Sequence, residues 1–153
     1  MSEKFIEESM GKRIHILFRL SMMNSRKEMK KLGCGAGDYA FLAVLFLDDG
    51  LSQDELSRRM RVDKSYTARA LAKLEKTGMV ERRPDPEEHR IKRVFLGKKA
   101  HDNKLNFLKI VQSWHKTLVK DIDGGDLNTV RSVMDKMIAN AEAFLGLEEI
   151  NAR

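Results

Sequence analysis

The sequence has few of the residues that build disulfides, metal centres or nucleophilic active sites. Its one cysteine, Cys34, permits no internal disulfide and supplies no Cys-x-x-Cys metal motif, which suits a reducing compartment. The glycine-rich stretch around it lacks the third glycine of a dinucleotide fingerprint. None of the four histidines has metal-ligand spacing or a local arrangement with the cysteine that suggests a nucleophile (His15, His89, His101 and His115). We therefore expect no catalytic residue, no metal and no cofactor.

Long hydrophobic runs are also absent, and the first residues do not resemble a targeting segment. The longest apolar run, Tyr39 to Leu47, is less than half of the roughly 20 residues that span a bilayer, so it predicts a core helix. The opening stretch MSEKFIEESM mixes acids into what would have to be a basic, acid-poor leader. We expect a cytoplasmic protein with no membrane partner. Its length suits one compact core, or one domain with oligomerisation helices.

Positive charge, by contrast, is plentiful and confined to one segment. Residues 51–100 hold 14 Lys and Arg against 8 Asp and Glu, whereas the two flanks together hold 15 of each. The formal excess of +6 therefore lies entirely in the middle third of the chain. A basic surface confined to one segment is typical of a nucleic-acid contact, because Lys and Arg neutralise phosphates and release counterions. The alternative is a solvated charged face.

Apolar residues recur at helical spacing at both ends of the chain. In the N-terminal part they form two stripes, which predict one long helix from about Phe5 to Leu32 that is buried on two sides. The C-terminal part predicts a helix from about Lys98 to Ile122 and a second one after Gly124-Gly125. These helices carry more apolar surface than one small domain can bury. Regions 5–32 and 98–146 are therefore predicted to form a two-fold dimer.

The middle of the chain carries signals for three short helices and a hairpin. Asp38 is the predicted N-cap of the first helix, which runs through Leu47. Ser52 and Glu55 form a capping box before the second helix, which ends at about Met60. Asp63 is the predicted N-cap of the third helix, which Gly78 ends. Two strands follow, at 79–83 and 91–96. This order predicts a mainly α fold with a small β-hairpin, in which a winged helix-turn-helix at 38–97 is flanked by dimerisation helices.

The end of the last short helix and the hairpin carry a specific combination of residues. They are Leu74-Glu75, Gly78-Met79-Val80, Arg82, Asp85-Pro86, Glu88-His89-Arg90 and Val94-Phe95-Leu96. This combination closely resembles the DNA-binding core of the multiple antibiotic resistance regulator (MarR) family. In that family a Leu-Glu-x-x-Gly-Leu-Val-x-Arg segment leads into an Asp-Pro-x-Asp-Arg-Arg wing and a Val-x-Leu strand. Glu88 and His89 stand here where the family usually has Asp and Arg, and Gly97 where it usually has Thr.

The helix that starts at Lys64 is predicted to present a short basic face. Ser65, Ala68, Arg69, Ala72 and Lys73 share this face, opposite the inward-facing Thr67, Leu71 and Leu74. Its small alanines allow close approach to base edges in a major groove, where Arg69 can contact guanine and Ser65 a base or a phosphate. Lys64 and Lys73 suit phosphate, and Tyr66 either stacks on the DNA backbone or covers the edge of its own domain. The alternative is an ordinary amphipathic surface helix.

The hairpin loop is predicted to project a cation toward DNA. Because Pro84 and Pro86 cannot donate to a strand ladder, they end pairing on the first strand and stiffen the loop. Arg90, with Lys92 near it in the chain, then meets the narrow, electronegative minor groove. Glu88 is predicted to orient Arg90 through a charge-assisted pair. A solvated hairpin of mixed charge is the alternative.

Two classes of function remain open from the sequence. The resemblance implies a dimeric, sequence-specific transcriptional regulator that binds double-stranded DNA at a pseudo-palindromic operator, specifically a repressor released by a small aromatic acid or phenol. It also suggests Arg19, on the first helix, as the residue that holds an effector carboxylate. Cys34 is either an oxidation sensor, as in some members of that family, or a small residue packed in a turn. The other class is a winged-helix module that docks on protein or RNA without operator binding.

Overall fold

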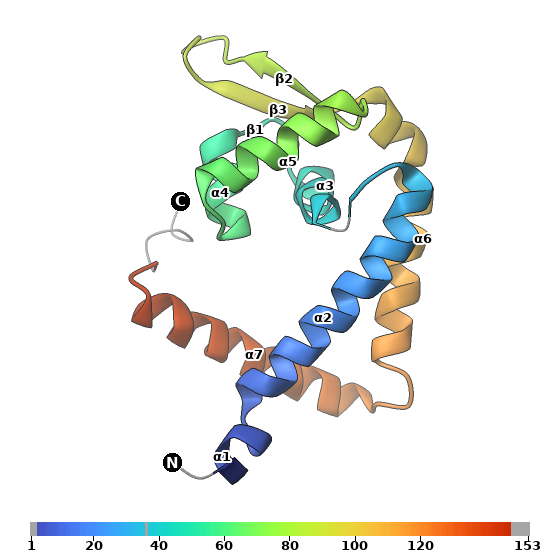
Figure 1. The fold of residues 1–153 in the computed structure, drawn as a ribbon, viewed down its shortest axis with the longest axis vertical. Coiled ribbons are helices and arrows are strands. Elements are labelled where there is room, and N and C mark those ends of the chain that lie inside the picture. The colour runs from blue at the N-terminus through green and yellow to red at the C-terminus, as the bar shows by residue number, and fades with distance from the viewer. Residues whose placement is uncertain (1–2, 36, 148–153) are drawn as a thin grey trace. The chain divides into compact units, whose positions relative to one another are not determined.

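The computed structural model describes residues 3–35 and 37–147, most of them in helices (Figure 1). The chain divides into two compact units, one up to Leu108 and one from Lys109 onward, so the division falls within α6. In chain order the elements are α1 (Glu3–Glu8), α2 (Met10–Met29), the 3-10 turn η1 (Lys30–Leu32), α3 (Asp38–Leu47), β1 (Leu51–Ser52), α4 (Gln53–Met60), α5 (Lys64–Lys76), β2 (Val80–Pro84), β3 (Lys92–Leu96), α6 (Lys98–Leu118) and α7 (Gly124–Phe144). The fold is mainly α with a small antiparallel sheet, as predicted.

The predicted N-terminal helix is interrupted at Ser9, so the prediction of one continuous helix from Phe5 is wrong there. Ser9 has extended backbone angles, and its hydroxyl accepts a hydrogen bond from the Lys12 amide at 3.2 Å, which makes it the N-cap of α2. After α2 and η1, Gly33 adopts a left-handed φ of +77° and ends the helical segment. The side chain of Phe5 lies outside the part of the chain that the structure describes.

The apolar face of α2 is largely exposed in the single chain, so the chain itself does not provide the predicted burial on two sides. Only Ser25 and Met29 are buried among the residues of α2. The following large apolar side chains of α2 are each exposed by 45% or more: Met10, Ile14, Ile16, Leu17, Phe18, Leu20 and Met23. Helical periodicity identifies an apolar face, but it does not say whether the same chain or a second one covers it.

Asp38 is the first residue of helix α3 and not its N-cap, so the predicted N-cap is wrong. Gly37 occupies the cap position, and Asp38 lies in the first turn. The Asp38 carboxylate accepts a hydrogen bond from the Gly35 amide at 3.1 Å and is buried. An acid in the first turn is also favourable, because it interacts with the positive end of the helix dipole.

The sheet contains one strand, β1, that is absent from the prediction. β3 pairs antiparallel with β2, from Val80 opposite Leu96 to Pro84 opposite Lys92, so both strands match their predicted ranges within one residue. Pro84 is the last paired residue of β2, as expected of a residue without an amide proton. On its other side β3 pairs with the two-residue strand β1, and the strand order is β1-β3-β2.

The hydrophobic core of the first unit includes residues of α3, α4, α5 and the hairpin. Its most completely buried side chains include Phe41 and Leu45 of α3, Leu56 of α4, Leu71 and Leu74 of α5, and Met79, Val80 and Val94 of the hairpin. Gly97 follows β3 where the backbone of Gly78 passes so closely that a Cβ at position 97 would collide with the Gly78 carbonyl oxygen. This close approach explains why glycine, rather than a residue with a side chain, stands there.

The two C-terminal helices differ slightly from their predicted bounds. α6 ends at Leu118 rather than near Ile122. α7 begins at Gly124, because the Asp123 carboxylate caps it by accepting from the Gly125 amide at 2.7 Å, so both glycines lie inside the helix and not before it. None of the residues of α7 is buried. No helix in the described part of the chain is long and apolar enough to cross a membrane.

Candidate nucleic-acid interface

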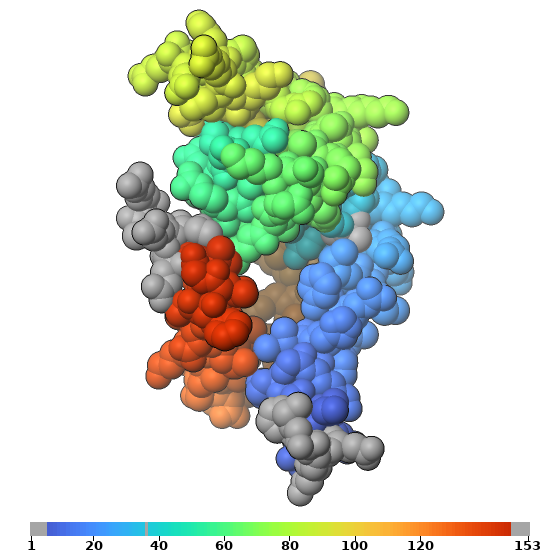
Figure 2. Space-filling view, turned by 60° about the vertical axis from the view of Figure 1, so that its left-hand side comes forward, coloured from blue at the N-terminus to red at the C-terminus, as the bar shows by residue number. Residues whose placement is uncertain are grey.

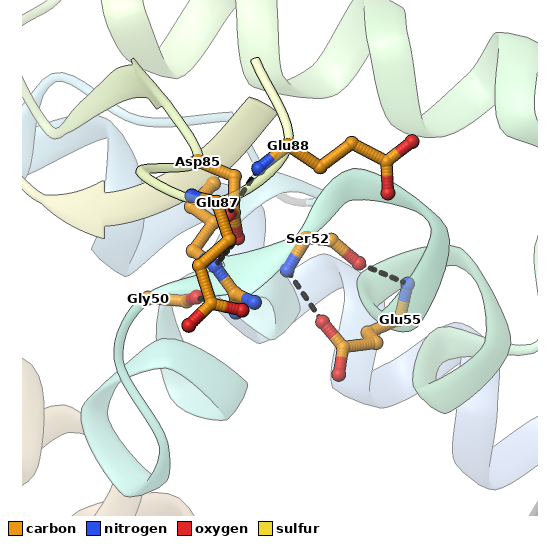
Figure 3. Close-up of polar contacts among 7 residues, drawn as sticks. Gly50, Ser52, Glu55, Asp85, Glu87 and Glu88 are labelled. Carbon is orange, nitrogen blue, oxygen red and sulfur yellow. Dashed lines mark hydrogen bonds and ion pairs between the residues drawn. The ribbon is translucent and has the colours of Figure 1, made fainter. Parts of the chain in front are cut away.

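Capped ends define where α4 and α5 begin. At α4 the Ser52 hydroxyl accepts from the Glu55 amide at 3.2 Å and the Glu55 carboxylate accepts from the Ser52 amide at 2.7 Å, which completes the predicted capping box (Figure 3). Hydrogen bonds with the side chain and the backbone of Ser52 lower the pKa of Glu55. At α5 the Asp63 carboxylate accepts from the Tyr66 amide at 2.7 Å, also as predicted.

A buried hydroxyl pair holds α5 against α4. The hydroxyls of Ser57 on α4 and Thr67 on α5 share a hydrogen bond of 2.9 Å. Thr67 is completely buried, and so are its neighbours on the inner face, Leu71 and Leu74. Because this inner face is shared with the core, the opposite face of α5 has a fixed orientation toward solvent.

The outward face of α5 has the composition that the sequence predicts. Ser65, Arg69, Ala72 and Lys73 are exposed, and Ala68 is half-buried. Arg69 and Lys73 form no ion pair with any residue in the described part of the chain. This face therefore offers two uncompensated cations separated by short side chains.

The two residues at the start of α5 have partners within the protein. The Lys64 ammonium lies 2.8 Å from a carboxylate oxygen of Asp54, at the start of α4. The Tyr66 ring stacks on Phe41 of α3, with 6.2 Å between ring centroids and 28° between planes. Its hydroxyl lies so close to Gly37 that a Cβ there would approach it to 2.6 Å. Of the two interpretations of Tyr66, this packing favours a cover for the edge of its own domain.

The wing turn, residues 85–91, is organised around the buried carboxylate of Asp85 (Figure 3). One oxygen of this carboxylate accepts from the amides of Glu87, at 2.8 Å, and Glu88, at 3.0 Å. The backbone of Asp85 also closes the loop, since its amide donates to the Ile91 carbonyl at 2.9 Å. Finally, the Ile91 amide donates to the Glu88 carbonyl at 2.8 Å, which forms the tight turn that contains Arg90.

The predicted pair between Glu88 and Arg90 is not formed in this structure, so that hypothesis needs correction. Both side chains are exposed, and neither forms an ion pair with any residue the structure describes. Figure 3 shows the Glu88 carboxylate directed away from the turn. Glu88 contributes to the turn through its backbone instead, because its amide and its carbonyl are both hydrogen-bonded.

Arg93 is the partner of the wing carboxylate, and neither Arg93 nor Asp85 is among the predicted site residues. Its Nε donates to the second oxygen of Asp85, and its Nη1 donates to the Gly50 carbonyl at 3.1 Å. The amides of Glu88 and Glu87, together with Arg93, hold the pKa of Asp85 below its usual value. The Asp-Pro pair of the wing was a visible signal for Asp85. No local signal distinguishes Arg93 from the neighbouring basic residues.

The structure divides the basic residues of 51–100 into two groups. The cations that pair with acids in this region or just before and after it are Arg59, Lys64, Arg82, Arg83, Arg93 and Lys98. Those without an ion pair to any described residue include Arg69, Lys73, Arg90 and Lys92. The second group includes cations of α5 as well as Arg90 and Lys92 of the wing, which is the yellow part of Figure 2 next to the green helices α4 and α5.

A groove of about 310 Å³ lies between the wing and the start of α4. Its lining comprises Ser52, Gln53 and Asp54 on one side and Arg90, Ile91 and Lys92 on the other. Arg90 and Lys92 both line this groove, so the two unpaired wing cations lie close to the helix pair. Its wing side is basic, whereas its α4 side carries the Asp54 carboxylate.

The remaining predicted residues lie apart from this surface. Arg19 is exposed on α2, with no ion pair to a described residue. Cys34 is buried, and its burial, with a smaller contribution from Asp38, raises the pKa of its thiol. A raised pKa disfavours the thiolate, so the geometry favours the packed residue over the oxidation sensor. The described residues contain no cluster of three or more side chains suited to a metal ion.

Comparison with known proteins identifies relatives of both the core and the whole chain. A family model described as "MarR family" matches residues 37–92. The HTH-type transcriptional regulator YybA of Bacillus subtilis is 34% identical over 80 residues, which cover 50% of this chain and about half, 53%, of that protein.

Solved structures extend the likeness over nearly the full chain. A MarR transcriptional regulator from Methanosarcina mazei is 31% identical, with a TM-score of 0.82, and the match covers 93% of this chain and 99% of that one. A variant MarR of E. coli complexed with operator DNA has a TM-score of 0.78 at 21% identity, over 90% of this chain and 99% of that one, which shows a shared fold.

Proposed function

This chain belongs to the MarR family of DNA-binding transcriptional regulators, and we propose that it is a dimeric repressor that binds a pseudo-palindromic operator through α5 and the wing. Members of this family regulate transcription and are not enzymes. One observation carries the proposal for the surface: unpaired cations occur on both the outward face of α5 and the wing. The operator complex of the E. coli relative supports the choice of DNA as partner.

We propose that α5 reads the sequence. Its outward face combines one arginine, Arg69, with the short side chains of Ser65, Ala68 and Ala72, so base edges in a major groove come within reach of the guanidinium. A bidentate contact between arginine and guanine discriminates against other bases. Lys73, further along the same face, supplies a phosphate contact without base preference.

We propose that the wing contacts the adjacent minor groove. Arg90 stands in a tight turn whose backbone is hydrogen-bonded on both sides, and Lys92 follows on the strand. A narrow minor groove concentrates negative potential and attracts arginine without a base code. The wing therefore adds affinity and a preference for groove shape, whereas α5 adds base preference.

The uncovered apolar surface supports two-fold assembly. Like α2, helix α7 carries exposed large apolar side chains. Val130, Val133, Met134 and Ile138 are each exposed by 46% or more. Surfaces of this kind mark protein interfaces, and most homo-oligomers are two-fold dimers. Two copies then present two α5 helices to half-sites about one helical turn apart.

Release by a small aromatic acid or phenol is the regulatory part of the proposal, with Arg19 as the residue for the carboxylate. Salicylate at millimolar concentration should raise the melting temperature and release DNA, because a ligand that binds the folded state stabilises it. Arg19→Gln should reduce both effects. If salicylate changes neither in the native protein, this effector class is wrong.

The experiment that tests the proposal is a gel shift with double-stranded DNA from upstream of the protein's own gene. We expect one discrete complex that resists competition by random DNA. Arg90→Ala should weaken it and lower the log–log salt slope by about one per subunit, or ~2 for a dimer. Arg26→Ala removes one arginine from the last turn of α2, which is not part of this surface, and serves as the matched control. Equal binding to random DNA, or preference for RNA, would contradict operator recognition.

A further inference from the structure

Arg93 differs from the other basic residues of the wing in that its guanidinium donates hydrogen bonds to two separate segments of the protein. Its Nε donates to the buried carboxylate of Asp85, and its Nη1 donates to the Gly50 carbonyl at 3.1 Å. Arg93 also lies opposite Ser52, the N-cap of α4, across the β1–β3 ladder. One guanidinium therefore joins the wing turn to the segment that leads into the helix pair.

The far end of this connection is itself held firmly. Gly50 has a left-handed φ of +81°, and a Cβ there would approach the Phe95 ring to 2.8 Å. Its amide donates to the Val94 carbonyl at 3.0 Å, which attaches it to β3. The Gly50 carbonyl is thus a fixed acceptor on the sheet, and the wing turn is the element that Arg93 holds to it.

The near end of the connection leads directly to Arg90. The two amides that donate to the Asp85 carboxylate belong to Glu87 and Glu88, which precede Arg90 in the wing turn. Ile91, immediately after Arg90, is bonded to Asp85 and Glu88 through its carbonyl and amide. The backbone on both sides of Arg90 is therefore anchored to Asp85, and Asp85 is anchored by Arg93.

We propose that Arg93 is a positioning residue that sets the direction of Arg90 toward DNA, and that Arg93 itself does not bind phosphate. The inference rests on the proposed wing contact and deepens it. Its requirement is geometric: a planar guanidinium spans a carboxylate and a carbonyl at once, whereas a lysine ammonium is a single point charge. A phosphate contact, in contrast, requires mainly the positive charge, which lysine retains.

This difference makes Arg93→Lys the decisive variant. We would measure fluorescence anisotropy on operator DNA over a range of salt concentrations for Arg93→Lys, Arg93→Gln and Arg90→Ala. Arg93→Lys and Arg93→Gln should weaken binding equally, by roughly tenfold if the charge-assisted contact of Arg90 is lost. In the Arg93→Lys background, Arg90→Ala should add little, because Arg90 is already misdirected.

Two further measurements separate positioning from general instability. Amide hydrogen exchange at Glu87, Glu88 and Ile91 should accelerate in Arg93→Lys, while α5 and the melting temperature stay unchanged. Asp85→Asn, which removes the other half of the connection, should reproduce the binding defect. Arg83→Lys is the matched control, because Arg83 pairs with Glu81 at 2.8 Å and holds no part of the turn.

The outcomes distinguish this inference from the proposed function. Near-native binding by Arg93→Lys with weak binding by Arg93→Gln would show that Arg93 is a phosphate contact and would overturn the inference alone. Unchanged binding by Arg90→Ala would overturn the wing contact itself, and the inference with it. Equal defects in Arg93→Lys and Asp85→Asn, with no further loss from Arg90→Ala, would support both.

Discussion

The winged segment at 38–97 buries most of its large apolar side chains, whereas helix α2 leaves most of its own exposed. In the winged segment Phe41, Leu56, Leu71 and Val94 are almost completely buried by the chain itself. In α2 most of the large apolar side chains remain about half exposed. Charge follows the same division, since the excess of +6 lies in residues 51–100 and the flanks hold equal numbers of acids and bases.

This difference indicates two kinds of surface in one chain. The winged segment completes its own core, so its exposed surface is free to be basic and to meet a polyanion. The apolar faces of α2 and α7 remain uncovered in one chain and call for an apolar partner. In the proposed dimer a second copy supplies that partner and, by symmetry, a second winged segment at a fixed spacing.

The largest expected effect tests the α2 side of this comparison. Phe18, on α2, is 56% exposed in the single chain, and we expect the partner chain to cover it. Phe18→Glu should convert the dimer to monomers at micromolar concentration, because two-fold symmetry buries two carboxylates at a cost of several kcal/mol each. Sedimentation velocity measures the change. Phe18→Leu keeps the apolar face and should stay dimeric, and a native protein that sediments as a monomer would refute the assembly.

The next effect tests the self-contained core. Leu71 is completely buried in α5, so Leu71→Ala should lower the free energy of unfolding by about 2–5 kcal/mol through lost contacts and a residual cavity. Leu47, at the end of α3 in the winged segment, is 89% exposed, and Leu47→Ala should change the free energy of unfolding by about 0.5 kcal/mol or less. Urea denaturation at one fixed protein concentration compares the two. Similar losses would mean that the comparison drawn from single-chain exposure is wrong.

The features that the sequence could predict are those with local signals. Helix caps and helix-ending glycines bond to backbone groups only a few residues away in sequence. Capping rules were therefore sufficient to place α4, α5 and the start of the hairpin from Ser52 with Glu55, Asp63 and Gly78. The two-residue strand β1 depends on where β3 lies, and no periodicity arises from so short a segment.

The internal partners of charged residues were much harder to predict. Glu88 and Arg90 are neighbours in sequence and form no pair, whereas Arg93 pairs with Asp85 across the turn and with Gly50 far earlier in the chain. Such pairs depend on the tertiary path of the backbone. The basic pattern therefore located the surface but did not show which of its cations are already neutralised within the protein.

A smaller effect tests the assignment of base reading to α5. Arg69→Ala should cost about 1–3 kcal/mol at the operator and relax the preference at one base pair of each half-site. Binding to random DNA should weaken less, because there Arg69 loses only an electrostatic interaction with phosphate and no base contact. Competition binding against operators altered at single positions measures both. Equal losses on operator and random DNA would make Arg69 a backbone contact instead.

The smallest expected effect concerns Lys64. Unlike Arg69 and Lys73 on the same helix, Lys64 is paired with an acid. Its ion pair with Asp54 is exposed, and such pairs are worth about 0–1 kcal/mol, so the ammonium is only loosely held. Lys64→Ala should still weaken DNA binding less than Lys73→Ala, because Lys64 must give up its pair with Asp54 in order to bind a DNA phosphate. Asp54→Asn should strengthen binding to random DNA. In the Asp54→Asn background Lys64→Ala should then cost as much as Lys73→Ala, a coupling that a double-mutant cycle measures. If Lys64→Ala and Lys73→Ala cost the same with Asp54 in place, Asp54 does not restrain Lys64, and all the cations of α5 meet DNA alike.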